Sequence, residues 1–255
     1  MAEKPFVLVS NDDGADAEGI RALAEALRAF ADVLVVAPDR ERSGTSHAIS
    51  LARPLRVSER GADVFAVDGT PVDCVYLGLL HLAPRRPAVV VSGVNHGYNL
   101  GADVFYSGTV AAAIEAAIRG VPAIAVSLAH SERDFTSAAS FAAAAVAALL
   151  DGSPLPPRTL LNVNVPPGRP TSYRVTRLGH RVYRDRVEER SDLRGRRYFW
   201  IGGPDAGHAD VAGSDCEAIA QGRISVTPLG LDLTEATLLA AGLPMAVEGF
   251  PRSAV

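Results

Sequence analysis

Residues 5–14 read PFVLVSNDDG, an unbroken apolar run that passes directly into a group of polar side chains. The run predicts a buried strand over Phe6–Ser10, because a parallel strand covered on both faces carries apolar side chains on each side. Asn11, Asp12, Asp13 and Gly14 follow at the carboxyl end of that strand. In open α/β sheets, ligands bind beside this end of the strands. The stretch therefore predicts both a fold class and the edge where a site belongs.

The same pattern continues through the first two thirds of the chain. Further buried strands are predicted at Val33–Ala37, Val64–Val67, Ala88–Ser92, Pro122–Ser127 and Leu160–Val165. Helices are predicted between them at Gly19–Phe30, 71–82, Thr109–Arg119 and Phe135–Leu150. Short buried strands that alternate with helices indicate a parallel sheet covered on both faces. Residues 1–167 are therefore predicted to form a Rossmann-like, three-layer α/β/α domain.

The composition changes after residue 167. Residues 171–201 are rich in arginine and aromatic side chains in rough alternation, which predicts an extended C-terminal β-hairpin arm. The arginines of this stretch could form a surface that binds a polyanion. Because acidic residues lie among them, a solvated face with paired charges is the alternative interpretation. A late strand is predicted at Ile224–Thr227, and a terminal helix at Leu233–Leu243 with Thr234 as its N-cap. Residues 168–255 are therefore predicted to be an arm region outside the main domain.

The composition also excludes several classes of protein. The 255 residues carry 25 Lys and Arg against 29 Asp and Glu, a formal net charge of −4. Without a basic excess, we expect no nucleic-acid polymer as a partner. No run reaches the ~18 apolar residues of a membrane span and no signal peptide is recognisable, so we expect no membrane partner and a cytoplasmic location. Cys74 and Cys216 show no zinc or disulfide spacing.

Two adjacent carboxylates, Asp12 and Asp13, are the first candidates for chemistry. Their negative charges repel each other, and a hard divalent cation with oxygen ligands would stabilise both as anions. A capped turn is the alternative interpretation, because Asn and Asp are good turn residues. The pair by itself leaves both interpretations open.

Two further polar segments, 37–47 and 92–101, follow other predicted strands, and a third, 106–109, opens a predicted helix. The helix start offers hydroxyl groups and free amides to an anion, although N-capping by Ser107 explains it equally well. His47 and His96 lie in these segments and are expected to line the site. The sequence contains no phosphate-binding P-loop, dinucleotide or nucleophile-elbow motif.

Several motifs follow one another in chain order: VSNDDG, VVAPDRERSGTSHAIS, DGTPVDCV, VVSGVNHGYNLGADVFYSGTVAAAIEA, VPAIAVS and GRISVTPL. Together they resemble the survival protein SurE family, and the resemblance covers nearly the whole chain. It implies a divalent-metal-dependent phosphatase that hydrolyses nucleoside 5′-monophosphates, with 3′-nucleotides and short polyphosphate accepted by some members. It also implies that 1–167 is the catalytic domain and that the arm region 168–255 builds a homodimer or homotetramer.

The resemblance further implies the site residues. The implied metal ligands are Asp12, Asp13, Ser43 and Asn95. The implied phosphate contacts are Asn11, Asn99, Ser107, Gly108 and Thr109. A shell of oxygen donors suits one Mg²⁺ or Mn²⁺ per subunit better than zinc. Asp12 and Asp13 are the implied catalytic residues, with Asp12 expected to orient or deprotonate an attacking water and an aspartyl-phosphate intermediate as the alternative.

Other classes of protein fit the sequence less well. A haloacid-dehalogenase-like phosphatase uses a D-x-D motif, whereas Asp12 and Asp13 are adjacent. A non-catalytic nucleotide-binding module and an assembly protein that works through its arm are the alternatives to an enzyme. The sequence leaves open the preferred nucleotide, the native metal, and the choice between dimer and tetramer.

Overall fold

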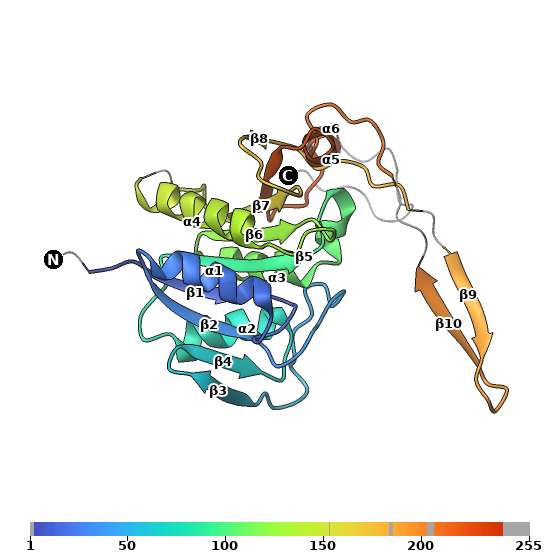
Figure 1. Ribbon diagram of the computed structural model, residues 1–255. Helices are drawn as coiled ribbons and strands as arrows, with labels where there is room; N and C mark the ends of the chain where they lie inside the picture. Colours follow the sequence, from blue (N-terminus) through green and yellow to red (C-terminus); the bar gives the residue numbers. More distant parts are fainter. Residues whose placement is uncertain (1–2, 153, 184–185, 203–206, 242–255) are drawn as a thin grey trace, which may run out of the picture.

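A computed structural model describes residues 3–152, 154–183, 186–202 and 207–241. Its centre is a nine-stranded sheet in the order β3-β4-β2-β1-β5-β6-β7-β11-β8, with helices on both faces (Figure 1). The strands are β1 Phe6–Ser10, β2 Asp32–Pro38, β3 Val57–Gly61, β4 Val64–Val67, β5 Val89–His96, β6 Ala123–Leu128, β7 Thr159–Val165, β8 Tyr173–Val175 and β11 Ile224–Gly230. The helices are α1 Glu18–Arg28, α2 Pro71–Leu77, α3 Gly108–Ile118, α4 Thr136–Leu150, α5 Asp215–Ala220 and α6 Ala236–Ala241, with a short π-helix at Gly78–Leu82 and a 3₁₀ helix at Gly101–Phe105.

The central strand β1 shows why its sequence lacks alternation. Val7 and Val9 pack into one buried cluster with side chains of α1 and α4. Phe6 and Leu8 point the other way, into a second cluster with side chains of α2 and α3. All five residues of β1 are buried. The strand therefore separates two hydrophobic layers, and the predicted three-layer α/β/α fold is confirmed.

The order of the strands creates a switch point beside β1. From β1 the chain passes to β2 on one side, and it later returns to β5 on the other side. Both neighbours run parallel to β1. In open α/β sheets the crevice at such a point, outside the carboxyl ends of the strands, is where ligands bind.

The sheet extends beyond the predicted main domain. The strand β11 pairs antiparallel with β7, and β8 adds to the far side of β11. The sheet is therefore mixed rather than purely parallel, and part of 168–255 belongs to it. The division at residue 167 stays a prediction about function and assembly.

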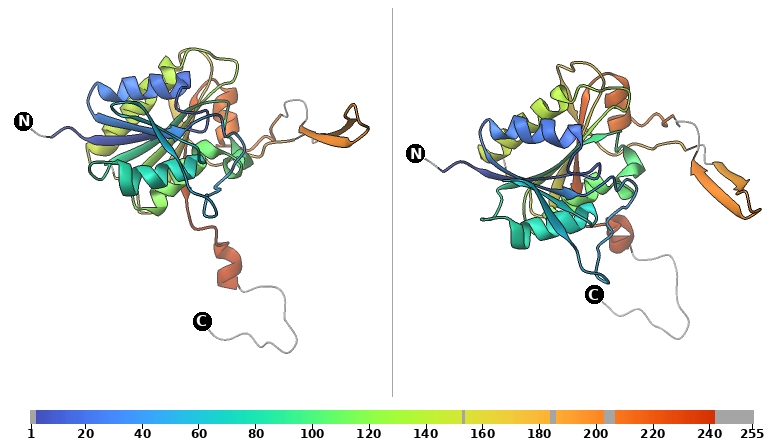
Figure 2. Two further views of the ribbon diagram at one scale, coloured as in Figure 1. Left: turned by 90° about the horizontal axis from the view of Figure 1, so that it is seen from below. Right: turned by 60° about the horizontal axis from the view of Figure 1, so that its bottom comes forward.

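The predicted arm is a shorter hairpin than the sequence suggested. Its strands β9 Arg186–Ser191 and β10 Arg197–Gly202 pair antiparallel and extend away from the sheet (Figures 1 and 2). The terminal helix α6 begins three residues after the predicted start at Leu233, and the predicted end at Leu243 lies outside the described residues. Within the described ranges, no helix is long and apolar enough to cross a membrane.

Candidate active site

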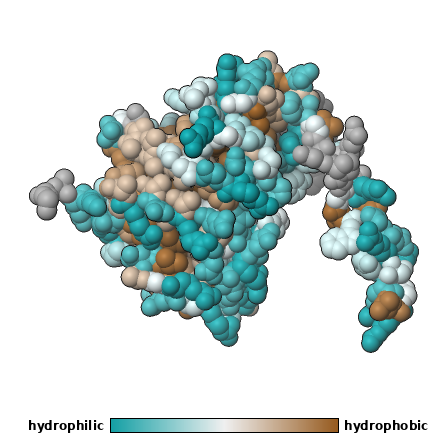
Figure 3. All heavy atoms as spheres, in the orientation of Figure 1, coloured by the Kyte–Doolittle hydropathy of each residue, from teal (hydrophilic) through white to brown (hydrophobic). Residues whose placement is uncertain are grey.

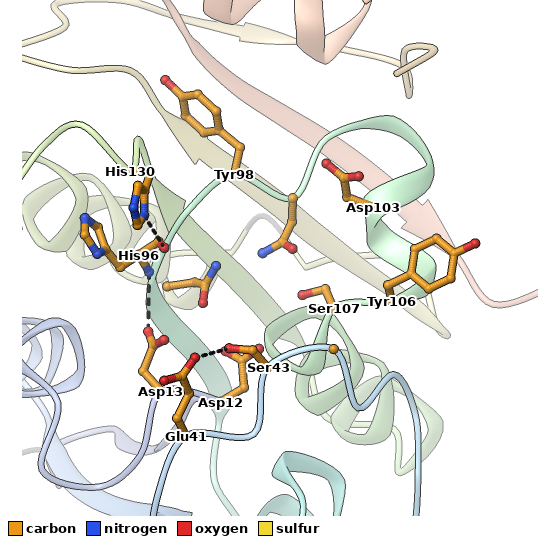
Figure 4. Close-up of a pocket in the computed structure, with 13 residues that line it drawn as sticks. Asp12, Asp13, Glu41, Ser43, His96, Tyr98, Asp103, Tyr106, Ser107 and His130 are labelled. Carbon is orange, nitrogen blue, oxygen red and sulfur yellow. Dashed lines mark hydrogen bonds between the residues drawn. The ribbon is translucent and has the colours of Figure 1, made fainter. Parts of the chain in front are cut away.

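A cavity of about 480 Å³ opens at the carboxyl edge of the sheet, over the switch point (Figure 4). Its walls come from the last residues of β5, from the segments that follow β1, β2, β5 and β6, and from the start of α3. The lining residues are Asp12, Asp13, Glu41, Ser43, Gly44, Asn95, His96, Tyr98, Asn99, Asp103, Tyr106, Ser107 and His130. The structure therefore brings together six of the nine predicted site residues: Asp12, Asp13, Ser43, Asn95, Asn99 and Ser107.

The turn after β1 places the two adjacent carboxylates at the floor of the cavity. Asn11 closes this turn, because its side chain donates to Gly14 O at 2.9 Å and accepts from Gly14 N at 3.2 Å. Gly14 has φ +107°, a conformation that L side chains rarely adopt. The turn interpretation of this segment is thus seen in the structure, and it holds Asp12 and Asp13 in place.

Burial raises the pKa of both carboxyl groups. The pKa of Asp12 is raised to about 6: desolvation by burial is the largest cause, the hydrogen bond from the Thr109 hydroxyl group opposes it, and the charge of Asp13 adds to it. Desolvation also raises the pKa of Asp13, whose Oδ2 accepts from His96 N at 3.3 Å. The described lining residues include four carboxylates and no lysine or arginine. The anionic form of this pair is therefore costly in the protein alone and would be favoured by a bound cation.

The donor chemistry of the cavity suits a hard divalent cation. Asp12, Asp13, Ser43 and Asn95 offer oxygen atoms, which Mg²⁺ and Mn²⁺ prefer. No group of three or more His, Cys, Asp or Glu side chains arranged for a metal occurs in the described part of the chain. A cation at this site would accordingly depend on the serine and the asparagine as well as on the two aspartates.

Asn95 reaches the cavity through an irregularity in β5. The pairing of β5 with β6 shifts register between Ser92 and Asn95, and such bulges redirect side chains at the end of a strand. Asn95 Nδ2 donates to Gly97 O at 2.8 Å. The amide nitrogen is thereby occupied, which leaves the side-chain oxygen as the group that Asn95 can offer to a cation. The strand predicted at Ala88–Ser92 is thus β5, which begins at Val89 and continues to His96.

Ser43 lies in the loop after β2, and backbone hydrogen bonds attach this loop to both sides of the cavity. Arg42 N donates to Asp12 O at 2.7 Å, and Ser46 N donates to Tyr106 O at 3.1 Å. His47 lies in the same loop but does not line the cavity. It points to the buried Glu115 of α3, with Nε2 3.5 Å from Oε2. The prediction that His47 lines the site is therefore wrong, whereas that for His96 is confirmed.

Asn99 and Ser107 also line the cavity, and Ser107 directly precedes the residues of α3 that contact Asp12. Asn99 is 7% exposed, and its Nδ2 donates to Ser127 Oγ at 2.7 Å while its backbone N–H donates to Asn164 Oδ1 at 2.8 Å. Ser107 Oγ accepts from Val110 N at 3.1 Å. Ser107 is thus the N-cap of α3 and also lines the cavity, and the anion-site interpretation of this helix start stays a prediction.

Three predicted phosphate contacts do not line the cavity: Asn11, Gly108 and Thr109. The Thr109 hydroxyl group donates to Asp12 Oδ1. Gly108 lies against the same side chain, since an added Cβ would be 2.8 Å from Asp12 Cβ. The start of α3 therefore fixes Asp12, and Asn11 fixes its turn.

Sequence reasoning missed several lining residues. His130 follows β6, so the rule that sites lie at carboxyl ends of strands would have found it. Its ring stacks on His96, with the ring centroids 4.4 Å apart. Asp103 carries no comparable signal. It lies in the 3₁₀ helix, where its carboxylate is 3.2 Å from Arg181 Nε and accepts from the Tyr183 hydroxyl group.

The sequence of this chain is similar to that of a known protein family over most of its length. Residues 7–185 match the family model described as Survival protein SurE. The chain belongs to the survival protein SurE family. It is 53% identical over 257 aligned residues to the 5′-nucleotidase SurE of Myxococcus xanthus, covering 99% of this chain and 98% of the relative. It is 59% identical over 232 residues to the 5′-nucleotidase SurE of Anaeromyxobacter dehalogenans, covering 89% and 91%.

A solved structure also has the fold of this chain. The crystal structure of the Sure protein from Aquifex aeolicus superposes with a TM-score of 0.82 at 40% identity, covering 93% of this chain and 98% of that one. The similarity therefore extends beyond the central sheet. Because β8 and β11 are part of that sheet, the SurE fold here includes residues from both predicted regions of the chain.

Proposed function

We propose that this chain is a divalent-metal-dependent 5′-nucleotidase that hydrolyses nucleoside 5′-monophosphates to nucleoside and phosphate. Nucleoside 3′-monophosphates and short polyphosphate are proposed as further substrates. The observation that carries the proposal is the pair of desolvated carboxylates, Asp12 and Asp13, in a cavity lined by oxygen donors without a cationic side chain. The names of the M. xanthus and A. dehalogenans relatives support the nucleotide substrate.

Four side chains are proposed to hold one Mg²⁺ or Mn²⁺ per subunit: Asp12, Asp13, Ser43 and Asn95. When bound, the metal would supply Lewis-acid chemistry at the phosphate. The two carboxylates have different hydrogen-bond partners: the Thr109 hydroxyl group donates to one oxygen of Asp12, and His96 N donates to Asp13. Thr109 engages one oxygen of Asp12, which leaves the other as the oxygen that Asp12 would offer to the cation and to an attacking water held beside it.

The phosphate is proposed to lie in the cavity beside the aspartates, against Asn99 and the N-terminal end of α3. This helix has 11 residues, and its N-terminal amide groups and dipole favour an anion. Ser107 and Asn99 line the cavity and offer a hydroxyl and an amide group. Gly108 and Thr109 are proposed to act through Asp12, and Asn11 through its turn. A negatively charged substrate could thus be held by a protein with a formal net charge of −4.

Phosphate release from AMP by the purified chain tests the proposed function. We expect hydrolysis in the presence of Mn²⁺ or Mg²⁺, loss on adding EDTA, and recovery when Mn²⁺ is restored in excess, because no cationic side chain lines the described cavity. Assays on GMP, 3′-AMP and tripolyphosphate in parallel rank the substrates. Hydrolysis that persists unchanged in EDTA would contradict the metal dependence, and nucleotide binding without hydrolysis would favour a non-catalytic binding module.

We further propose that the hairpin β9–β10 joins subunits into a homodimer or homotetramer. A two-stranded hairpin is marginally stable alone in water. This one nevertheless exposes a run of apolar side chains: Tyr198 41%, Phe199 55%, Trp200 59% and Ile201 88%. Figure 3 shows small hydrophobic patches on the otherwise mostly hydrophilic projecting hairpin. A second subunit would cover them. A cytoplasmic location stays a prediction.

Replacing residues 186–202 with a short Gly-Ser linker should reduce the oligomer size and retain phosphatase activity. The hairpin contributes no residue to the cavity, whereas β8 is part of the sheet and is kept. Light scattering coupled to size-exclusion chromatography gives the mass, and the AMP assay gives the activity. An unchanged oligomer would refute the assembly role, and loss of activity in a folded variant would place the arm within catalysis.

A further inference from the structure

Glu41 lines the cavity but has no role in the proposed chemistry so far. Its side chain lies beside Ser43, and Figure 4 shows the two joined by a hydrogen bond. Ser43 Oγ donates to Glu41 Oε1 at 2.8 Å. Within the described ranges, Glu41 forms no ion pair with Lys, Arg or His, although Arg40 and Arg42 flank it and pair with Asp39. The carboxylate of Glu41 is therefore directed to the serine instead of to a neighbouring arginine.

A hydroxyl group that serves as a metal ligand has a particular requirement. It carries one proton and two lone pairs, and it rotates freely unless a partner fixes the proton. A proton pointing at the cation would oppose binding, so a neighbouring acceptor must hold it elsewhere. A carboxylate is the strongest such acceptor in proteins, because hydrogen bonds to ionised groups are shorter and stronger than neutral ones. Groups that orient metal ligands in this way tune metal affinity.

Hydrogen bonds tie the loop around Glu41 to neighbouring segments. Arg42, between the two residues, donates its backbone N–H to Asp12 O at 2.7 Å and its Nη2 to Asp68 O at 3.1 Å. Thr45 Oγ1 donates to Arg42 O at 2.9 Å. The backbone between Glu41 and Ser43 is thus tied to the same turn that carries the aspartates. The backbone that carries both side chains is therefore positioned, and the hydrogen bond between the exposed Glu41 and Ser43 side chains is what orients the hydroxyl group.

Given the metal site of the proposed function, on which this step rests, we propose that Glu41 is a positioning residue for Ser43. Its carboxylate accepts the Ser43 hydroxyl proton and so turns an oxygen lone pair toward the metal. Glu41 itself need not touch the metal. A rival explanation is that its charge acts through space on the cation, and the presence of Glu41 among the charges that raise the pKa of Asp13 shows that this charge is felt there.

Binding of Mn²⁺ to the purified full chain without nucleotide tests the proposal, with electron paramagnetic resonance of free Mn²⁺ as the readout. We expect Glu41→Ala to weaken Mn²⁺ binding about 10-fold, the lower end for a group that orients a ligand. Glu41→Gln should retain most of the affinity, since its amide oxygen still accepts the hydrogen bond. Glu59→Ala, at an exposed carboxylate on the edge strand β3, is the matched control and should bind like the unaltered chain.

The double variant Glu41→Ala/Ser43→Ala separates the two explanations. If Glu41 acts through Ser43, then adding Glu41→Ala to Ser43→Ala causes no further loss of Mn²⁺ affinity. An equal loss in both backgrounds, an equal loss for Gln and Ala at residue 41, or no loss for Glu41→Ala would each overturn the proposal. Circular dichroism confirms that each variant is folded. Failure of the unaltered chain to bind Mn²⁺ would refute the proposed function itself, which is a distinguishable result.

Discussion

Asp13→Asn should abolish metal-stimulated hydrolysis of AMP while leaving the protein folded. The amide keeps the shape of the side chain and can still accept from His96 N, the contact that now measures 3.3 Å. It loses the negative charge, however, and with it one of the two carboxylates that would hold the cation. We expect a loss larger than the about 10–100-fold that follows removal of a group outside the ligand shell. The phosphate-release assay in excess Mn²⁺ measures it.

The same substitution should not lower thermal stability in the absence of metal. Desolvation raises the pKa of Asp13, which means that the folded protein disfavours its anion. A neutral amide avoids that cost, so the unfolding temperature without metal should be equal or higher. Added Mn²⁺ should raise the unfolding temperature of the unaltered chain by mass action and have little effect on the variant. A variant that keeps full activity with Mn²⁺ would show that the proposed ligand set is wrong.

How far the sequence determines this molecule depends on the range of the interactions involved. The strand Phe6–Ser10 was predicted correctly because its own run of apolar side chains, without polar alternation, indicates burial on both faces. That Asp12 and Asn95 line one cavity was predictable from the order of the strands, because both residues lie at the carboxyl ends of adjacent parallel strands. Such rules need only the pattern of elements and not the contacts of single side chains.

Contacts between segments that are distant in the chain could not be predicted from the sequence. His47 and Ser43 lie in one short loop, yet only Ser43 faces the cavity, because His47 pairs with Glu115 of α3. Likewise, nothing in the sequence of β11 shows that it returns to pair with β7 in the central sheet. The direction of a loop side chain is set by what packs against it, and that partner can lie far away in the sequence.

Gly108→Ala should reduce phosphatase activity by about 100-fold, because displacing a catalytic group by about 1 Å can have this effect. An added Cβ would lie 2.8 Å from Asp12 Cβ, 3.0 Å from Asp12 Oδ2 and 3.0 Å from Pro71 Cγ. Pro71 belongs to the start of α2 and cannot move easily, so Asp12 or the start of α3 must shift. Either movement disturbs the hydrogen bond from the Thr109 hydroxyl group to Asp12.

The control for this variant is Gly230→Ala at the end of β11, where an added Cβ meets nothing within 4 Å. It should keep full activity. Helix propensity gives Gly→Ala about 1 kcal/mol of stabilisation in a helix interior, and Gly108 is the first residue of α3. Overpacking costs about 1–3 kcal/mol. A lower unfolding temperature for Gly108→Ala, together with lost activity and weakened Mn²⁺ binding, is therefore the expected combination. A higher unfolding temperature with activity retained would mean that the chain accommodates the methyl group, and that close packing of α3 against Asp12 is not what positions the carboxylate.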